Sequence, residues 1–256
     1  MAEGDSVLRL ARRLDGSLAD QRVSVRTPGR RRPAGLAATE LDGRALERAE
    51  SRGKHLLIHF EDGLVLHSHL GMRGSWHIYG AGERWRRPAR DAWIAIAANS
   101  SEAVNFGGST MRIATEAQLS RDPRLARLGP DILAADFEPA AAIARMRGTN
   151  PQIQLGEALL GQRLVAGIGN IFKSEGCFEA GVDPTRQLES LDDDQLAAVL
   201  LATRRLMLQA VETGRQPKRI YRRAGQPCPR CRSPLRSRAQ GDSARTTYWC
   251  PRCQSG

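Results

Sequence analysis

Four cysteines near the C-terminus have a spacing that suits a metal ion. Cys228 and Cys231 form one C-x-x-C pair, Cys250 and Cys253 form another, and residues 232–249 separate the two pairs. Each pair can present two thiolates to one ion while the intervening segment folds back as a hairpin, which is typical of a tetrahedral zinc site. Two disulfides are the alternative, and they would require an oxidising compartment. Because the chain begins with no recognisable secretory signal, we expect one structural Zn²⁺ with no open position for a catalytic water.

The basic charge of the chain is concentrated around these cysteines. From residue 214 to the C-terminus there are eleven Arg or Lys residues and a single acid, Asp242, so this segment carries +10 (11 − 1) of the formal +11. A metal-pinned hairpin with this charge suits a polyanion, and nucleic acid is the partner that we expect. An anionic membrane surface is the weaker alternative, because no lipidation motif or basic amphipathic helix stands out. No apolar run of about eighteen residues is present, so we expect no membrane span.

The first half of the chain has the pattern of a mostly β domain. Apolar residues recur at helical spacing between about residues 3 and 18, which predicts a leading helix. The apolar segments 55–60 and 64–67 flank the turn residues 61–63 and predict a hairpin. Further short strands are expected at 78–79, 92–97 and 104–106. We therefore predict one domain over residues 1–125.

The pattern becomes helical after residues 129–131. Helices are expected at 137–146, 154–160, 170–178 and 192–212. Gly214 is a helix stop signal, and the basic cysteine segment begins directly after it. The chain is thus predicted to be an α+β multidomain protein, with a helical domain at 126–214 and a metal module at 215–256.

This order of elements, together with four separated motifs, resembles the formamidopyrimidine-DNA glycosylase / endonuclease VIII family of base-excision repair enzymes. The motifs are Ala2-Glu3-Gly4-Asp5, then residues 53–57 with 69–72, then 165–171, and finally 245–254. The resemblance spans essentially the whole chain. It implies an N-terminal β-sandwich with a leading helix, a helix–two-turn–helix domain and a C-terminal zinc-finger β-hairpin with four cysteine ligands. The pair Gly4-Asp5 resembles the endonuclease VIII enzymes, and an actinobacterial-type branch of them, more than it resembles the formamidopyrimidine glycosylases.

The resemblance also implies catalytic roles for Ala2, Glu3 and Lys54. The family's nucleophile is the α-amine of residue 2 after removal of the initiator Met, and its reference pKa of about 8 leaves roughly a tenth of it neutral at pH 7. A neutral amine can attack C1′ of the deoxyribose and form a Schiff base. The family has proline at this position, whereas this chain has Ala2, which offers a primary amine. Glu3 matches the family's proton-transferring acid. Lys54 matches a lysine near the sugar and phosphate of the lesion.

Three further residues match positions that contact DNA in the family. Met72 matches a residue that wedges into the gap left by a flipped base. Asn170 follows a Gly-x-Gly turn and can donate to a phosphate oxygen at a helix N-terminus. Arg245, five residues before Cys250, matches a phosphate-gripping arginine of the zinc finger. The family's other wedge residues have no clear equivalent between residues 105 and 111.

The resemblance therefore implies a bifunctional DNA glycosylase/AP lyase that removes an oxidised base and cleaves the abasic strand by β- and then δ-elimination. Gly4-Asp5 favours oxidised pyrimidines as the substrate. Met72 is a feature of the formamidopyrimidine side of the family, so oxidised purines remain an alternative substrate. The rival interpretation is a non-catalytic protein that binds damaged DNA, and its support is Ala2 together with Ser6, where the family has a second glutamate. We expect damaged DNA as the partner, no membrane association, a monomer and a bacterial cytoplasmic location at the nucleoid.

Overall fold

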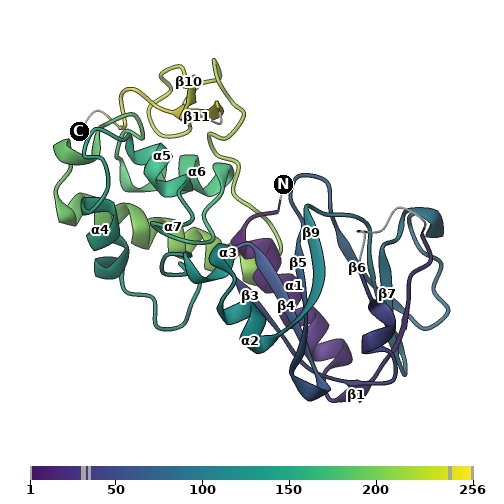
Figure 1. Ribbon diagram of the computed structural model, residues 1–256. Helices are drawn as coiled ribbons and strands as arrows, with labels where there is room; N and C mark the ends of the chain where they lie inside the picture. The colour runs from purple at the N-terminus through teal and green to yellow at the C-terminus, as the bar shows by residue number, and fades with distance from the viewer. Residues whose placement is uncertain (1, 30–32, 34–35, 242–243, 255–256) are drawn as a thin grey trace. The chain divides into compact units, whose positions relative to one another are not determined.

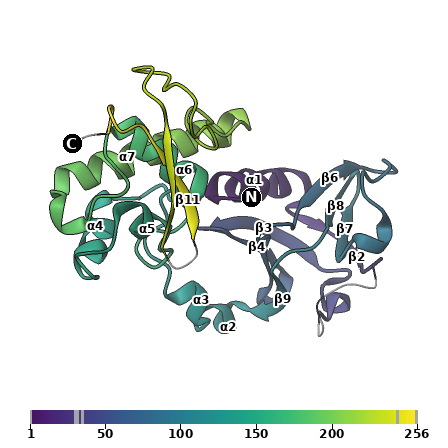
Figure 2. The ribbon, with the colours of Figure 1, turned by 90° about the horizontal axis from the view of Figure 1, so that it is seen from above.

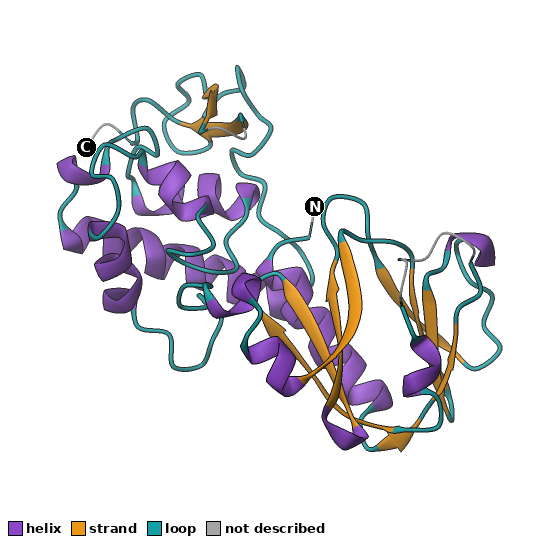
Figure 3. Ribbon diagram, in the orientation of Figure 1, coloured by secondary structure: helices purple, strands orange, loops and turns teal. Residues whose placement is uncertain are grey.

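The chain forms two compact units. The computed structural model describes all residues except 1, 30–32, 34–35, 242–243 and 255–256. The first unit contains Ala2 and residues 6–126, and the second contains residues 3–5 and residues from 127 onward. Most of the strands belong to the first unit and most of the long helices to the second (Figure 3). Within the described residues, every helix is too short or too polar to cross a membrane.

Two antiparallel sheets build the first unit. The first sheet has the strand order β1-β3-β4-β5-β9, and the second has the order β2-β7-β8-β6. The strands of the first sheet are β1 (Gln21–Arg22), β3 (Ala45–Arg52), β4 (His55–Phe60), β5 (Leu64–His69) and β9 (Thr110–Thr115). The strands of the second are β2 (Ser24–Arg26), β6 (Trp76–Gly80), β7 (Ile94–Ala98) and β8 (Ser101–Asn105).

Both sheets share one apolar core with the leading helix α1 (Gly4–Leu18). Because side chains alternate across a strand, β4 directs Leu56, Ile58 and Phe60 into this core and its histidines to the opposite face. The second sheet contributes Trp76, Ile94, Ile96, Ala98 and Ala103 to the same core. The unit is therefore the β-sandwich with a leading helix that the sequence predicts.

Two short helices pack on the other face of the first sheet. They are α2 (Glu116–Ser120) and α3 (Pro123–Ala126). The Thr115 side chain caps α2 by accepting a hydrogen bond from the Gln118 backbone, and Leu119 and Leu125 are buried. This face of the sheet therefore holds polar side chains that are shielded from water. Short 3-10 helices lie at Ala38–Leu41, Glu61–Gly63, Ala89–Asp91 and, in the second unit, Leu188–Ser190.

The second unit is organised around one buried helix. Its helices are α4 (Pro139–Arg147), α5 (Leu155–Leu160), α6 (Asn170–Ala180) and α7 (Asp193–Thr213), and its hairpin is β10 (Arg236–Gln240) with β11 (Arg245–Trp249). Helix α6 packs against α5, α7 and β11, and its residues from Asn170 to Phe178 are buried (Figures 1 and 2). Asp192 caps the start of α7, and Gly214 ends it with a positive φ of 70°.

The predicted helices between residues 137 and 212 are confirmed to within two residues at each end. The hairpin of residues 55–67 is also confirmed as β4 and β5. Strands β3 and β9 were not expected, because their charged and polar residues face solvent or the covered face of the sheet and break the apolar run. The expected strand at 104–106 is the end of β8, which begins earlier, at Ser101.

Candidate active site and metal centre

The Glu3 carboxylate caps the N-terminus of helix α6. Glu3 is fully buried, and its two oxygens accept hydrogen bonds from the backbone N–H groups of Ile171 at 2.8 Å and Phe172 at 3.3 Å. These N–H groups have no partner within the helix, and the helix dipole favours a negative charge beside them. The sequence therefore brings Glu3 and the G-x-G-N turn together across more than 160 residues, and both carboxylate oxygens are held in place.

Gly169 makes room for this carboxylate. A Cβ atom at position 169 would lie 2.2 Å from Cδ of Glu3, so any side chain would displace it. The backbone of the same N-terminal segment is tied to the turn, because Gly4 N–H donates to the Gly167 carbonyl at 2.9 Å. In the structure, Gly169 serves the close approach of Glu3.

Asn170 and Arg245 belong to one cluster in the second unit. The Nδ2 group of Asn170 donates to the backbone carbonyl of Thr246 at 2.9 Å, and Arg245 is the neighbouring residue on β11. Oδ1 of Asn170 is buried and has no hydrogen-bond partner among the described residues. The start of β11 therefore links these two predicted phosphate ligands. One amide hydrogen of Asn170 is already bonded to the Thr246 carbonyl.

Lys173 is a buried ionisable residue that the sequence analysis did not single out. Its side chain is fully buried, and Nζ donates to Oγ1 of Thr247 on β11 at 2.6 Å. Burial lowers the pKa of Lys173 to about 8, with Arg245 also lowering it and Cys177 and Glu3 raising it. A cation is thus held close enough to Glu3 to interact with its charge. The available signal was a lysine directly after the apolar pair Ile171-Phe172 that follows the G-x-G-N turn.

The other predicted catalytic residues, Ala2 and Lys54, lie in the first unit. Ala2 is half-buried and packs against the main core, directly before Glu3 in the chain. Lys54 lies in the turn between β3 and β4, after Gly53, which has a positive φ of 58°. Burial lowers the pKa values of His55 and His69, and the charge of Lys54 lowers them further, which places Lys54 beside a group of histidines.

Met72 lies in the turn that follows β5 and is 65% exposed. A side chain that is this exposed is not part of the apolar core. The turn itself is fixed, because Gly71 has a positive φ of 59° and its N–H donates to Nδ1 of His69 at 3.3 Å. Met72 is therefore exposed to solvent on a defined turn, and its role as a wedge stays a prediction.

The four predicted metal ligands converge on one point. The Sγ atoms of Cys228, Cys231, Cys250 and Cys253 all lie within 4.8 Å of one another. The Sγ separations are 3.9 Å for Cys228–Cys253 and 3.4 Å for Cys231–Cys250, both far longer than a disulfide bond of about 2.05 Å. A tetrahedral ion with Zn–S bonds of about 2.3 Å places its sulfurs about 3.8 Å apart. The residues therefore fit one structural Zn²⁺.

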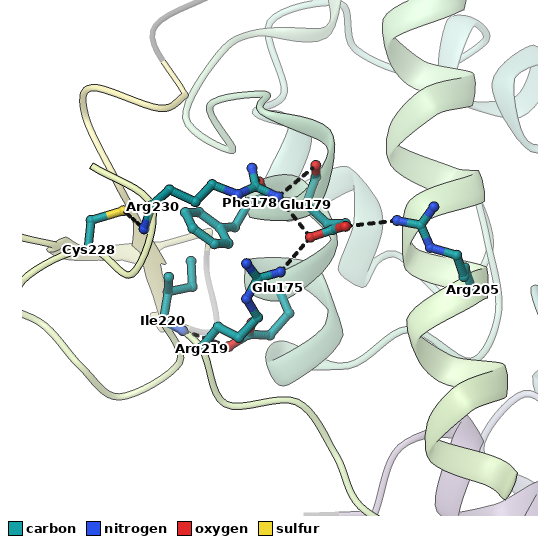
Figure 4. Close-up of polar contacts among 8 residues, drawn as sticks. All are labelled: Glu175, Phe178, Glu179, Arg205, Arg219, Ile220, Cys228 and Arg230. Atoms are coloured by element: carbon teal, nitrogen blue, oxygen red, sulfur yellow. Dashed lines mark hydrogen bonds and ion pairs between the residues drawn. The ribbon is translucent and has the colours of Figure 1, made fainter. Parts of the chain in front are cut away.

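The first cysteine pair is attached to α6 by Arg230, which lies between Cys228 and Cys231. Its guanidinium donates to the Phe178 carbonyl at 2.7 Å and to Oε2 of Glu179 at 2.8 Å, and it lies 4.4 Å from the Phe178 ring centroid (Figure 4). Arg219 and Arg205 bind the same Glu179 carboxylate at 2.7 and 2.8 Å. Three arginines from α7, the linker and the metal module thus meet on one carboxylate.

The second cysteine pair is attached through Gln254, which is fully buried. Its Oε1 accepts from the Cys250 backbone N–H at 2.8 Å, and its Nε2 donates to the Val182 carbonyl at 2.9 Å. A small apolar cluster of Phe178, Ile220, Leu235 and the cysteines fills the space between the two attachments. The metal module is therefore fixed to α6 and to the loop that follows it.

These features define the class of protein. Three family models match in order: the formamidopyrimidine-DNA glycosylase N-terminal domain over residues 1–116, its H2TH domain over 128–221, and a zinc finger found in FPG and IleRS over 225–256. Together they cover nearly all of the chain. The chain belongs to the formamidopyrimidine-DNA glycosylase / endonuclease VIII family, as the sequence motifs predict.

Individual relatives place the chain near the endonuclease 8 members. It is 38% identical over 269 residues to probable endonuclease 8 2 of Streptomyces coelicolor, covering 100% of this chain and 95% of the relative. It is 33% identical over 266 residues to the DNA-(apurinic or apyrimidinic site) lyase Nei2 of Mycolicibacterium smegmatis, covering 100% and 99%. The fold matches Lactococcus lactis Fpg in complex with abasic-site DNA, with a TM-score of 0.84, 20% identity and full coverage of both chains.

Proposed function

We propose that this protein is a bifunctional DNA glycosylase and AP lyase of base excision repair. The observation that carries the proposal is the buried Glu3 carboxylate, held on two N–H groups of α6 and preceded in the chain by a residue whose α-amine becomes available when Met1 is removed. Membership of the family supports it, as does the similarity to relatives named endonuclease 8 and AP lyase. The zinc module supplies structure and DNA affinity, not chemistry, because four cysteine ligands leave no open position.

In the proposed mechanism, the neutral α-amine of Ala2 attacks C1′ of the damaged nucleotide. A C–N bond forms as the N-glycosidic bond breaks, and the base leaves after it has gained a proton. The Glu3 carboxyl group gives its proton to the ring oxygen, the C1′–O4′ bond breaks, and the nitrogen loses a proton to water as the C1′=N bond of the Schiff base forms. The Glu3 carboxylate then moves protons during strand cleavage. Loss of a 2′ proton then expels the 3′ phosphate by β-elimination, and δ-elimination expels the 5′ phosphate. Lys54 holds a phosphate close to the reacting sugar.

The substrate class proposed is oxidised pyrimidines in DNA. Gly4-Asp5 supports this choice, together with similarity to relatives named endonuclease 8. Asn170 and Arg245 hold the DNA backbone, and Met72 fills the space left by the flipped base. The protein acts as a monomer in the cytoplasm at the bacterial nucleoid, without a membrane partner.

Borohydride trapping on DNA with an abasic site tests the proposal. A Schiff base is reduced to a stable covalent adduct, and peptide mapping by mass spectrometry locates it. We expect the adduct on the α-amine of Ala2, in protein that has lost Met1. An adduct on Lys54, or trapping by protein that retains Met1, would show that the nucleophile is a group other than the α-amine of Ala2. Binding of abasic DNA without any adduct would support the non-catalytic alternative.

The primary amine of Ala2 predicts a slower base-removal step than a proline would give. Alanine lacks the fixed ring, so its nitrogen is held less firmly, and a misplacement of about 1 Å can reduce a rate on the order of a hundredfold. The Ala2→Pro variant is the matched comparison, because it changes only the ring at the nucleophile. We expect faster single-turnover base removal in this variant with unchanged affinity for abasic DNA. A slower variant would mean that the site is shaped for a primary amine.

A further inference from the structure

The covered face of the first sheet carries a line of polar side chains that the proposed chemistry does not use. Strand pairing sets His55 opposite His69 on β4 and β5, and His67 opposite Arg112 on β5 and β9. His67 and His69 are two residues apart, so all four side chains lie on one face of the sheet. His67 is fully buried, whereas His55 and His69 are half-buried near the end of their strands beside Lys54.

Hydrogen bonds connect part of this line into a chain that begins at a carboxylate. Asp122 of the segment between α2 and α3 pairs with the Arg112 guanidinium. Nε of Arg112 lies 3.3 Å from Nδ1 of His67, and Nε2 of His67 lies 2.8 Å from Nδ1 of His55. The chain therefore runs from Asp122 through Arg112 and His67 to His55.

The direction of this chain follows from the chemistry of its members. A guanidinium N–H only donates, so Nδ1 of His67 must accept and carry no proton. Burial lowers the pKa of His67 to about 4 and that of His55 to about 3, so both rings are neutral at pH 7. A neutral His67 then has its proton on Nε2 and donates it to Nδ1 of His55. His55 in turn must carry its own proton on Nε2.

His69 has the same tautomer for a separate reason. Its Nδ1 accepts from the Gly71 backbone N–H at 3.3 Å and lies 2.6 Å from Oγ of Ser109. The Gly71 N–H can only donate, which favours a proton on Nε2; the Ser109 hydroxyl, which also lies 3.2 Å from the His69 carbonyl, then donates to Nδ1. The rings of His55 and His69 are 4.8 Å apart, and the charge of Lys54 acts on both. Two neutral N–H donors and one ammonium group thus lie together at this end of the sheet.

We propose that Nε2–H of His55, fixed as a donor by the Asp122–Arg112–His67 chain, binds an oxygen of the DNA phosphate that Lys54 contacts. This inference rests on the proposed function, because it assumes DNA at Lys54. His67 occupies Nδ1 of His55, so Nε2–H is the group that His55 can offer to an outside acceptor. Neutral donors suit this position, because protonated imidazoles would repel Lys54 and weaken its hold on the phosphate. A metal ion is the wrong occupant, since the lone pairs at Nδ1 are already used and Nε2 carries hydrogen.

The tautomers can be measured directly. Long-range ¹H–¹⁵N correlation spectra of the DNA-free protein at pH 7 distinguish Nδ1–H, Nε2–H and doubly protonated histidines. We expect Nε2–H signals from His55, His67 and His69. A proton on Nδ1 of His55, or a doubly protonated ring, would overturn the proposal. This measurement needs no DNA and no Schiff base, so its result is independent of the proposed enzymatic activity.

Two variants of His55 separate its two nitrogens. His55→Asn keeps an acceptor for His67 but loses the outer donor, so affinity for abasic-site DNA should fall roughly tenfold while the thermal midpoint is unchanged. His55→Gln keeps a donor near the Nε2 position, so its affinity should stay within about threefold, while loss of the inner acceptor lowers the thermal midpoint. Equal affinities of the parent and His55→Asn would overturn the proposal.

Salt dependence distinguishes the histidine from the lysine. A neutral donor displaces no counterion, so His55→Asn should leave the slope of log affinity against log salt unchanged. Lys54→Gln should lower that slope by about one unit. If the two variants change the slope equally, His55 contributes charge and the neutral-donor proposal fails. Both assays measure binding alone, so they remain informative even if borohydride trapping shows no adduct.

Discussion

The two units use buried polar groups in different ways. In the second unit, Glu3, Lys173 and Asn170 are buried on or beside α6, and each is bonded to a backbone or side chain of that unit. In the first unit, Lys54 and Met72 lie in turns at the ends of strands, and the buried polar side chains, among them His67 and Asp122, belong to the sheet and to the segment that covers it. The acid that we propose to transfer protons is thus held by a helix, whereas the groups that we propose to contact the lesion are presented on turns.

This difference predicts how substitutions will behave. Changes around α6 should alter both folding and activity, because each polar group there is fixed by partners that would be left unpaired in a buried setting. Changes in the turns of the first unit should alter DNA recognition with little effect on stability. The following variants test this separation, in order from the largest expected effect to the smallest.

Glu3→Gln should have the largest effect. Loss of the proton-transferring carboxyl group should reduce single-turnover cleavage of abasic DNA by roughly a hundredfold to ten thousandfold. The amide also turns an N–H group toward the start of α6, where it meets backbone donors, so the free energy of unfolding should fall by about 1–3 kcal/mol. Denaturant unfolding and single-turnover rates measure the two effects. A variant as stable and as active as the parent would show that Glu3 has no role in catalysis.

Cys250→Ser should abolish the zinc site and most of the DNA affinity. The metal module has little apolar core of its own, so loss of one thiolate or treatment with a chelator should unfold it. Zinc content and affinity for abasic DNA are the measurements. Cys177→Ala is the matched control, since Cys177 is a cysteine outside the metal cluster and should leave the zinc content unchanged. Unchanged affinity of Cys250→Ser would show that the module does not hold the DNA.

Arg245→Ala should weaken DNA binding evenly across sequences. A contact to a phosphate carries no base information, so the loss should be similar for different duplexes and the salt slope should fall by about one unit. Arg236→Ala removes the same charge from an exposed position on the neighbouring strand, and it serves as the control. An equal change of slope in both variants would assign the effect to net charge instead of to a specific contact.

Met72→Ala should reduce processing of lesions in duplex DNA by about tenfold and leave the thermal midpoint unchanged, because the side chain is 65% exposed. The same lesion in single-stranded DNA should be processed at the parent rate, since no gap in a stack needs filling. Leu201→Ala on α7 is the control, as Leu201 is the other large apolar residue exposed among the described residues, at 52%. Equal losses on both DNA forms would exclude the wedge role.

Lys173→Met should change the pH dependence of stability. Burial lowers the pKa of Lys173 to about 8, below its unfolded value of about 10.5. Between these two values the unfolded chain binds more protons, so Lys173 makes the parent gain stability as the pH rises from 8 to 10.5. The variant should lack this gain. Denaturant unfolding across this pH range measures it, and a parent curve that falls in this window would contradict the lowered pKa.

The helices and the metal ligands were predictable from sequence because their signals are local. Apolar spacing with a capping Asp192 and a terminating Gly214 defines α7, and the two C-x-x-C pairs define the zinc site. Strand β3 gave no such signal, because its charged residues Glu47, Arg48 and Glu50 interrupt the apolar pattern of a strand buried on one face.

The residues that the sequence missed depend on contacts between distant segments. A helical lysine such as Lys173 is normally exposed, and it is buried here because α6 packs against α5, α7 and β11. Motif comparison pointed to Glu3, but the need for Gly169 beside it appears only when residues 3 and 169 are adjacent in space. The tautomers of His55 and His67 likewise follow from pairing with Arg112 on another strand.

The three arginines on Glu179 have a consequence for protein engineering. Zinc fingers are often treated as portable cassettes, yet Arg230 of this one depends on a carboxylate, a carbonyl and an aromatic ring that all belong to α6. A graft of residues 215–256 onto another scaffold would leave Arg219 and Arg230 without Glu179. The smallest transplantable unit therefore includes α6 along with the finger, and a chimaera should exchange both together.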